Sequence, residues 1–103
     1  AMRPSPTCIM CSCDMFAIKI IRGLRQLGRR VPEDVSVTGF DDVPWVTQLA
    51  EVPLTTIHQP RETMGRQTAQ MLLKRIADPG RTVEKMILLP EVVVRESLGP
   101  APR

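Results

Sequence analysis

Short apolar runs alternate with segments of helical periodicity along the 103 residues, and this alternation is the strongest constraint on the fold. The runs at 7–12, 35–40 and 54–57 are rich in apolar or β-branched residues, which predicts strands. Apolar residues recur every three to four positions at 14–27 and 61–77, which predicts helices. The pattern therefore predicts the α/β class, with right-handed βαβ units and a partial doubly wound (Rossmann-like) parallel sheet.

The first predicted helix has clear signals at both ends. Asp14 is expected to cap its N-terminus and Gly28 to end it. One apolar stripe is expected to pack on the sheet, made of Ala17, Ile20, Ile21, Leu24 and Leu27. Met15 and Ile18 fall outside this stripe. They indicate either a second buried surface, such as a subunit contact, or scattered exposed side chains.

The remaining segments are predicted from turn residues and short apolar runs. Residues 43–53 are expected to form a loop with one helical turn, and residues 86–89 and 92–94 to be extended. The proline-rich residues 1–6 and the tail 98–103 are expected to be disordered. The folded part is therefore predicted to span residues 7–97.

Three cysteines, Cys8, Cys11 and Cys13, lie close together near the start of the chain. This spacing could suit a metal ion, but alternation along a strand would point Cys8 away from the other two. We therefore expect small buried thiols and no metal site. No apolar run reaches the length of a membrane span, so no membrane role is expected.

Carboxylates follow two of the predicted strands. Asp14 follows the first strand, while Asp41 and Asp42 follow the second. Because ligands of parallel sheets bind at the carboxyl ends of the strands, Asp14 and Asp41 are expected to share a crevice that accepts hydroxyl groups. No Ser or Cys has an evident His partner and no glycine-rich phosphate loop is present, so we expect a binding module without catalytic residues or a cofactor.

The order of motifs resembles the lactose/galactose-repressor (LacI/GalR) family of bacterial transcription regulators over about residues 7–97. The resemblance is carried by Cys13–Ala17, by Gly23–Pro44 with its Gly-Phe-Asp-Asp segment, and by Pro53–Pro60 followed by Met64 and Gly65. It implies the C-terminal part of an effector-binding core like the type I periplasmic sugar-binding proteins. In that core, residues 61–87 would match the segment that visits the other subdomain.

The resemblance also implies functional residues. Asp41 matches the family's effector-binding aspartate, and Cys13 takes a position where many members carry a sugar-contacting Asn. Asp14 and Arg61 are assigned to the same effector site. The family's dimer interface implies a further set: Met15, Ile18, Arg22, Trp45 and Leu49.

A missing partner surface is implied for the second predicted helix. Its apolar residues Met64, Met71, Leu72 and Ile76 would pack on elements that lie outside this chain. We therefore expect this helix either to fold back on the remaining sheet or to insert into a second copy, as in a domain-swapped homodimer.

The function implied by the resemblance is transcription regulation in the cytoplasm. A sugar-like small molecule would bind the core and control DNA binding by a helix-turn-helix domain outside these residues. A sugar-binding protein of a transporter, with the same fold, is the alternative. Such a protein would need a secretory signal, which residues 1–6 do not resemble.

Overall fold

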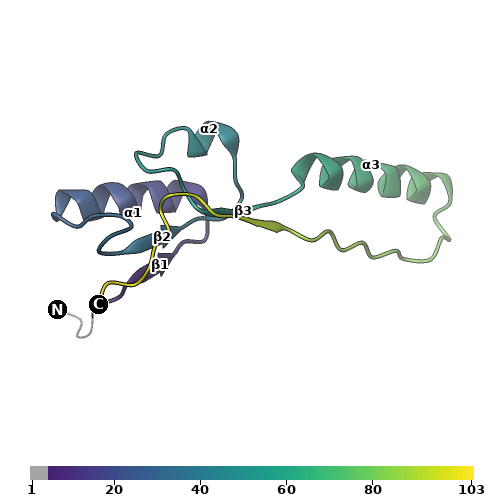
Figure 1. The fold of residues 1–103 in the computed structure, drawn as a ribbon. Coiled ribbons are helices and arrows are strands. Elements are labelled where there is room, and N and C mark those ends of the chain that lie inside the picture. Colours follow the sequence, from purple (N-terminus) through teal and green to yellow (C-terminus); the bar gives the residue numbers. More distant parts are fainter. Residues whose placement is uncertain (1–4) are drawn as a thin grey trace. The chain divides into compact units, whose positions relative to one another are not determined.

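The computed structural model describes residues 5–103 and confirms the α/β class. Its elements in chain order are β1 (Cys8–Met10), α1 (Asp14–Gln26), β2 (Ser36–Thr38), α2 (Pro44–Thr47), β3 (Thr56–His58), α3 (Arg61–Ala77) and β4 (Glu91–Val93) (Figure 1). The chain forms two compact units. The first contains the chain up to His58 together with Glu91–Arg103, and the second contains Gln59–Pro90.

The strands of the first unit confirm the parallel arrangement and add one antiparallel strand. β1 and β2 are parallel, with Ile9 opposite Val37. Isolated parallel bridges, Thr38 to Thr55 and Asp41 to His58, continue this order from β2 to β3. β4 runs antiparallel to β3, with Ile57 opposite Val92. The carboxyl ends of β1, β2 and β3 therefore point the same way, as a ligand site at strand ends requires.

The core of the first unit lies between α1 and the strands. Ala17 and Ile21 of α1 are buried against Val37 and Leu54. The expected apolar stripe is only partly right, because Ile20 is 37% exposed and Leu27 is 80% exposed. Helical spacing places both residues at one edge of the stripe, outside the part of α1 that packs on the strands.

The end of α1 matches its predicted stop signal. Gly28 has a φ of 73°, a left-handed conformation that glycine adopts without steric cost. The amide of Gly28 donates to the carbonyl of Arg25, and the amide of Arg29 donates to the carbonyl of Leu24. These bonds satisfy carbonyls that the helix leaves unpaired, so the chain turns here as the sequence predicts.

The cysteines are less buried than expected. All three are free; Cys8 is exposed, whereas Cys11 and Cys13 are half-buried. The reason is that β1 pairs only with β2 along the described chain, so one of its edges stays open. Burial, assisted by the neighbouring Cys13 and Cys8, raises the pKa of the Cys11 thiol above its ordinary value.

The C-terminal segment is bonded to the first unit beyond residue 97, so the predicted disorder from residue 98 is wrong. Ser97 is fully buried; its hydroxyl donates to the carbonyl of Val37 and accepts from the amide of Thr55. The amide of Gly99 donates to the Ser36 hydroxyl, at 3.0 Å. The chain is therefore held against β2 at least as far as Gly99. Of the predicted disordered lead, residues 1–4 lie outside the described part.

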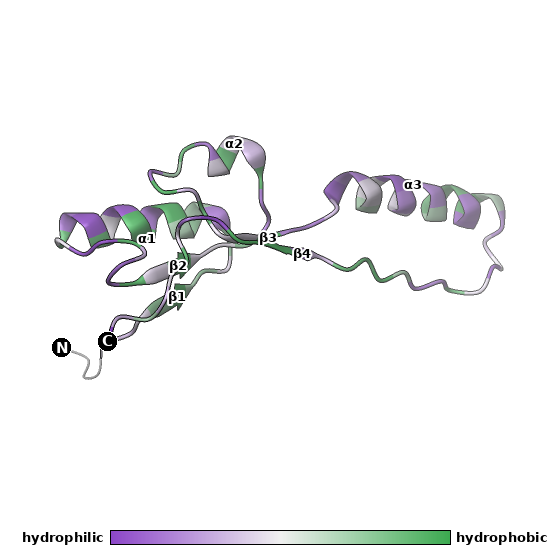
Figure 2. Ribbon diagram, viewed as in Figure 1, coloured by the Kyte–Doolittle hydropathy of each residue, from purple (hydrophilic) through white to green (hydrophobic). Residues whose placement is uncertain are grey.

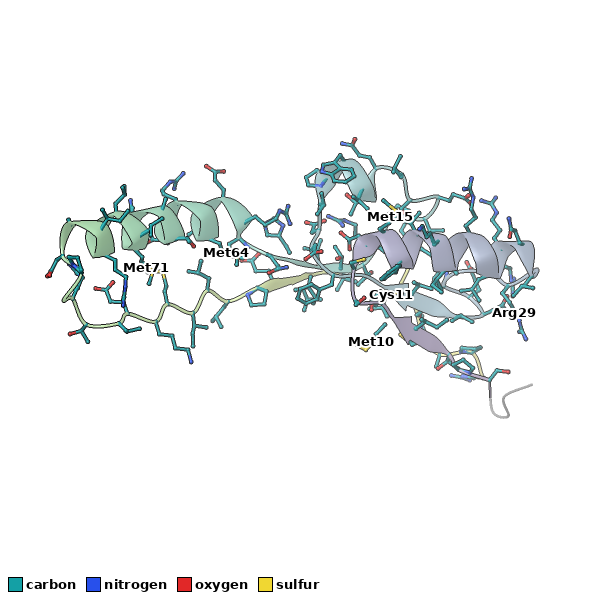
Figure 3. All side chains as sticks on the ribbon, turned by 180° about the vertical axis from the view of Figure 1, so that it is seen from behind. Met10, Cys11, Met15, Arg29, Met64 and Met71 are labelled. Atoms are coloured by element: carbon teal, nitrogen blue, oxygen red, sulfur yellow. The ribbon has the colours of Figure 1, made fainter. Side chains whose placement is uncertain are left out.

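The second unit consists of α3 and the segment that returns from it. The bounds of α3 match the prediction, but none of its residues is buried. Met64 and Met71 face the returning segment, where a cavity of about 570 Å³ is also lined by Met86 and Leu88 (Figure 3). Figure 2 shows in green the apolar residues of this returning segment. They are largely exposed, for example Leu89 at 82%. The expected burial of α3 within this chain is therefore not found.

Replacing Leu54 with alanine tests the core of the first unit. Leu54 is 1% exposed, so we expect Leu54→Ala to lower the free energy of unfolding by about 2–5 kcal/mol. Urea unfolding followed by the fluorescence of Trp45, the chain's single tryptophan, measures this. Leu27→Ala is the matched control and should cost less than about 0.5 kcal/mol. Equal effects of the two substitutions would contradict the placement of the core.

Candidate functional site

The carboxyl end of β2 leads into two consecutive residues with unusual backbone geometry. Asp41 has a φ of 109° and Asp42 a φ of 52°, a region that few residues other than glycine adopt. The amide of Asp41 donates to the carbonyl of Ile57 at 2.9 Å, which ties the loop to β3. Positive φ at two adjacent non-glycine residues persists only where surrounding contacts hold it, and it is often found at functional sites.

The Asp42 carboxylate supplies such contacts. Its Oδ1 lies 2.9 Å from Nη1 of Arg95, and its Oδ2 lies 2.9 Å from Nδ1 of His58. Nη1 of Arg95 also donates to the carbonyl of Leu54. We call Asp42, His58 and Arg95 the Asp42 network. Burial alone would raise the pKa of Asp42, but the bonds from Arg95 and His58 outweigh it and hold the pKa below its ordinary value.

Asp14, the first residue of α1, lies against this loop and is 2% exposed. Its Oδ1 accepts a hydrogen bond of 2.5 Å from the Thr56 hydroxyl, and its Oδ2 accepts one of 3.1 Å from the amide of Val43. The prediction that Asp14 caps α1 is therefore wrong. Cys13 occupies the N-cap position, and no side chain caps the helix. The carboxylate instead joins the start of α1 to β3 and to the residue after Asp42.

Gly39 permits this close packing. A Cβ atom at this position would collide with Oδ1 of Asp14 and would lie 3.0 Å from the side chain of Leu54. The glycine of the Gly-Phe-Asp-Asp segment is therefore required because α1 begins very close to the end of β2.

The predicted site residues fall into three groups. Asp41 and Cys13 are half-buried at the carboxyl ends of β2 and β1, as predicted. Asp14 is more deeply buried than these two residues, and both of its carboxylate oxygens accept hydrogen bonds from the protein. Arg61 is the exposed first residue of α3, in the second unit.

Sequence reasoning missed the Asp42 network. From the sequence alone, no role is assigned to His58 or to Arg95. The only available signal was the position of His58 at the end of a predicted strand, where a parallel sheet brings strand ends together. The pairing with Arg95 depends on β4, which the sequence places only roughly.

The residues assigned to a dimer interface lie around α1 and α2. Met15 and Ile18 are half-buried; Met15 lies on the side of α1 toward α2 (Figure 3), and Ile18, three residues later, shares its face of the helix. Trp45 and Leu49 are 68% and 61% exposed. Phe16, 55% exposed, lies on the opposite flank of α1.

Among residues 5–103, no group of three or more His, Cys, Asp or Glu side chains is arranged to hold a metal ion. None of the helices in this range is long and apolar enough to cross a membrane.

A sequence model of the periplasmic binding protein-like domain matches residues 1–98. The chain belongs to this family. It is 42% identical over 96 residues to the HTH-type transcriptional regulator MalR of Streptomyces coelicolor, covering 93% of this chain and 28% of that protein. It is 37% identical over 98 residues to the HTH-type transcriptional repressor PurR of Photobacterium profundum, covering 95% and 29%.

Solved structures agree with this assignment. A complex of the transcriptional regulator CelR with cellobiose has a TM-score of 0.78 and 42% identity, covering 88% of this chain and 28% of that one. A LacI family transcriptional regulator from Enterococcus faecalis with bound ribose has a TM-score of 0.85 and 36% identity, covering 94% and 36%.

The resemblance to LacI-type regulators and the type I fold fragment are thereby confirmed. The periplasmic binding protein-like chain spans 28–29% of the length of the two regulators compared by sequence. It contains the Gly-Phe-Asp-Asp loop and the Asp42 network within its first unit.

The Asp42 network predicts a specific dependence of stability on pH. The pKa of Asp42 is lowered in the folded chain, so its pairing stabilises the fold above the unfolded pKa near 3.8 and is lost as pH falls through the folded pKa. Asp42→Asn should therefore cost about 1–3 kcal/mol at neutral pH, and the difference from wild type should close in acid.

Urea unfolding at a series of pH values measures this difference. Glu96→Gln, at an exposed residue next to Arg95, is the control and should show no comparable difference at neutral pH. A cost of Asp42→Asn that stayed constant from neutral to strongly acidic pH would contradict the pairing.

Proposed function

We propose that this chain is the effector-binding and dimerisation part of a LacI-type transcription regulator and that it binds a polyhydroxylated, sugar-like molecule. The observation that carries this proposal is the loop of Asp41 and Asp42. It lies at the carboxyl end of a parallel strand, with a backbone held in an uncommon conformation, in a chain similar to regulators solved with cellobiose and with ribose.

The regulator interpretation is better supported than the transporter alternative. The similar proteins MalR, PurR and the LacI family protein of Enterococcus faecalis are transcription regulators. In this proposal the chain itself is not catalytic and needs no cofactor. DNA is bound by a helix-turn-helix domain beyond these residues, so the protein acts in the cytoplasm.

Asp41 is the proposed recognition residue. A carboxylate accepts hydrogen bonds only, and its two oxygens can accept from neighbouring hydroxyl groups of one sugar ring. Cys13 would lie against the same ligand, but a thiol is a weak donor and acceptor, so its contribution is mainly to shape. Arg61, in the second unit, stays a prediction of the family resemblance. Asp14, whose oxygens are already bonded, supports the loop and does not contact the ligand in this proposal.

A titration followed by NMR tests the role of Asp41. Adding cellobiose or ribose to the ¹⁵N-labelled chain should shift the amide signals of Asp41 and its neighbours, even where binding is weak. Asp41→Asn should weaken the binding about tenfold, because hydrogen bonds to a charged acceptor are worth about 1.5–3 kcal/mol.

The control is Asp34→Asn, which makes the same substitution in a distant turn. Asp34 is held by Arg30, which lowers its pKa to about 2. This variant should bind the sugars as wild type does. If Asp41→Asn bound them equally well, Asp41 would be removed from the site.

We also propose that α1 and α2 form a homodimer interface. Trp45 in α2 and Leu49 just after it expose large apolar surfaces. Met15 and Ile18 of α1 add two half-buried apolar side chains. Exposed apolar side chains that gather on one side are typical of interaction sites. The exposed residues of α3, including Leu72 and Ile76, are proposed to be covered by missing parts of the core or by a swapped second copy.

Ile18→Glu tests this interface. A charge buried between two copies without a partner is costly, so the dimer dissociation constant should rise at least tenfold. Sedimentation equilibrium measures it, and the emission of Trp45 should move to longer wavelength as dimers dissociate. Phe16→Glu places the same charge on the other flank of α1 and should leave association unchanged. The reverse outcome would move the interface to the Phe16 flank.

A further inference from the structure

The Asp42 network lies where the chain leaves and re-enters the first unit. His58 is the last residue of β3, and Gln59 begins the second unit. Arg95 follows β4, through which the chain returns at Glu91. One carboxylate therefore binds side chains from both connecting strands, at 2.9 Å each.

The same carboxylate belongs to the residue next to Asp41. Asp42 has a φ of 52° and Asp41 a φ of 109°, so the two residues share one strained turn. Aspartate tolerates the left-handed region better than most residues, but the conformation still has to be held by its surroundings. Only 13% of the Asp42 side chain is exposed, so its two bonds are shielded from water.

Arg95 is itself fixed by the scaffold. Its side chain donates to the carbonyl of Leu54, and its backbone amide donates to the Thr55 hydroxyl at 2.8 Å. The arginine that binds Asp42 is therefore anchored to the segment that enters β3. Movement of the Asp41–Asp42 turn would have to break or carry along these bonds.

We propose that Asp42 is a positioning residue that holds Asp41 in its ligand-facing conformation and links this turn to the two strands that connect the units. The inference rests on the proposed function, because it assigns Asp42 to the same sugar-like ligand. It adds that ligand contact at Asp41 is transmitted through Asp42 to His58, at the end of β3, and to Arg95, just after β4.

Two NMR readouts on the ligand-free chain test the positioning role directly. The HN–Hα coupling of Asp41 reports its φ. The ring nitrogens of His58, the chain's single histidine, report which nitrogen carries the proton. In mildly alkaline solution, the bond to Asp42 should keep the proton on Nδ1 in wild type. Asp42→Asn should shift the proton toward Nε2 and change the Asp41 coupling, whereas Asp34→Asn should change neither.

Cellobiose affinity provides a third readout. Asp42→Asn should weaken cellobiose binding about tenfold, while Asp34→Asn, which also breaks an aspartate–arginine pair, should leave it unchanged. In wild type, cellobiose should also shift the ring signals of His58. His58→Gln is a milder second variant, useful if Asp42→Asn does not fold, and it should likewise alter the Asp41 coupling.

The outcomes separate this inference from the proposed function. If cellobiose and ribose left wild type unchanged, the proposed function would fail and the two ligand-free readouts would still decide the role of Asp42. An unchanged Asp41 coupling and an unchanged His58 proton in Asp42→Asn would overturn the inference. Equal loss of affinity in Asp42→Asn and Asp34→Asn would also overturn it, because it would indicate general destabilisation.

Discussion

The buried carboxylate of Asp14 is the interaction on which the first unit depends. It accepts from the Thr56 hydroxyl and from the Val43 amide, so one side chain joins α1, β3 and the loop after β2. A buried carboxylate is tolerable only where it is well hydrogen-bonded, which makes these two partners obligatory. Gly39 leaves the space in which the carboxylate lies, and the turn of Asp41 and Asp42 is built directly above it.

The Asp42 network extends this support to the strands that connect the two units. Asp14 fixes the turn from below, and Asp42 fixes it to His58 and Arg95. The second unit has no comparable interior, since no residue of α3 is buried. Buried packing and buried hydrogen bonds therefore stabilise mainly the first unit of the described chain, which also contains the core residues Ile21, Val37 and Leu54.

Sequence patterns predicted those features of the fold that depend on residues close together in the chain. The span of α3, the stop at Gly28 and the strand ends bearing Asp41 follow from periodicity and turn chemistry over a few residues. The role of Asp14 could not be predicted in this way, because an aspartate at an expected helix start is normally its N-cap, and only tertiary packing directs Asp14 to Thr56 and Val43. The Asp42 network was hidden for the same reason. It joins three residues through strand register, and one of them follows the antiparallel β4.

Hydrogen exchange at the amide of Val43 tests the central claim, that buried Asp14 fixes the ligand loop to the scaffold. The account predicts that this amide, bonded to Oδ2 of Asp14, exchanges as slowly as the core amide of Val37. Exchange at the rate of an exposed loop amide, while Val37 stayed protected, would contradict it.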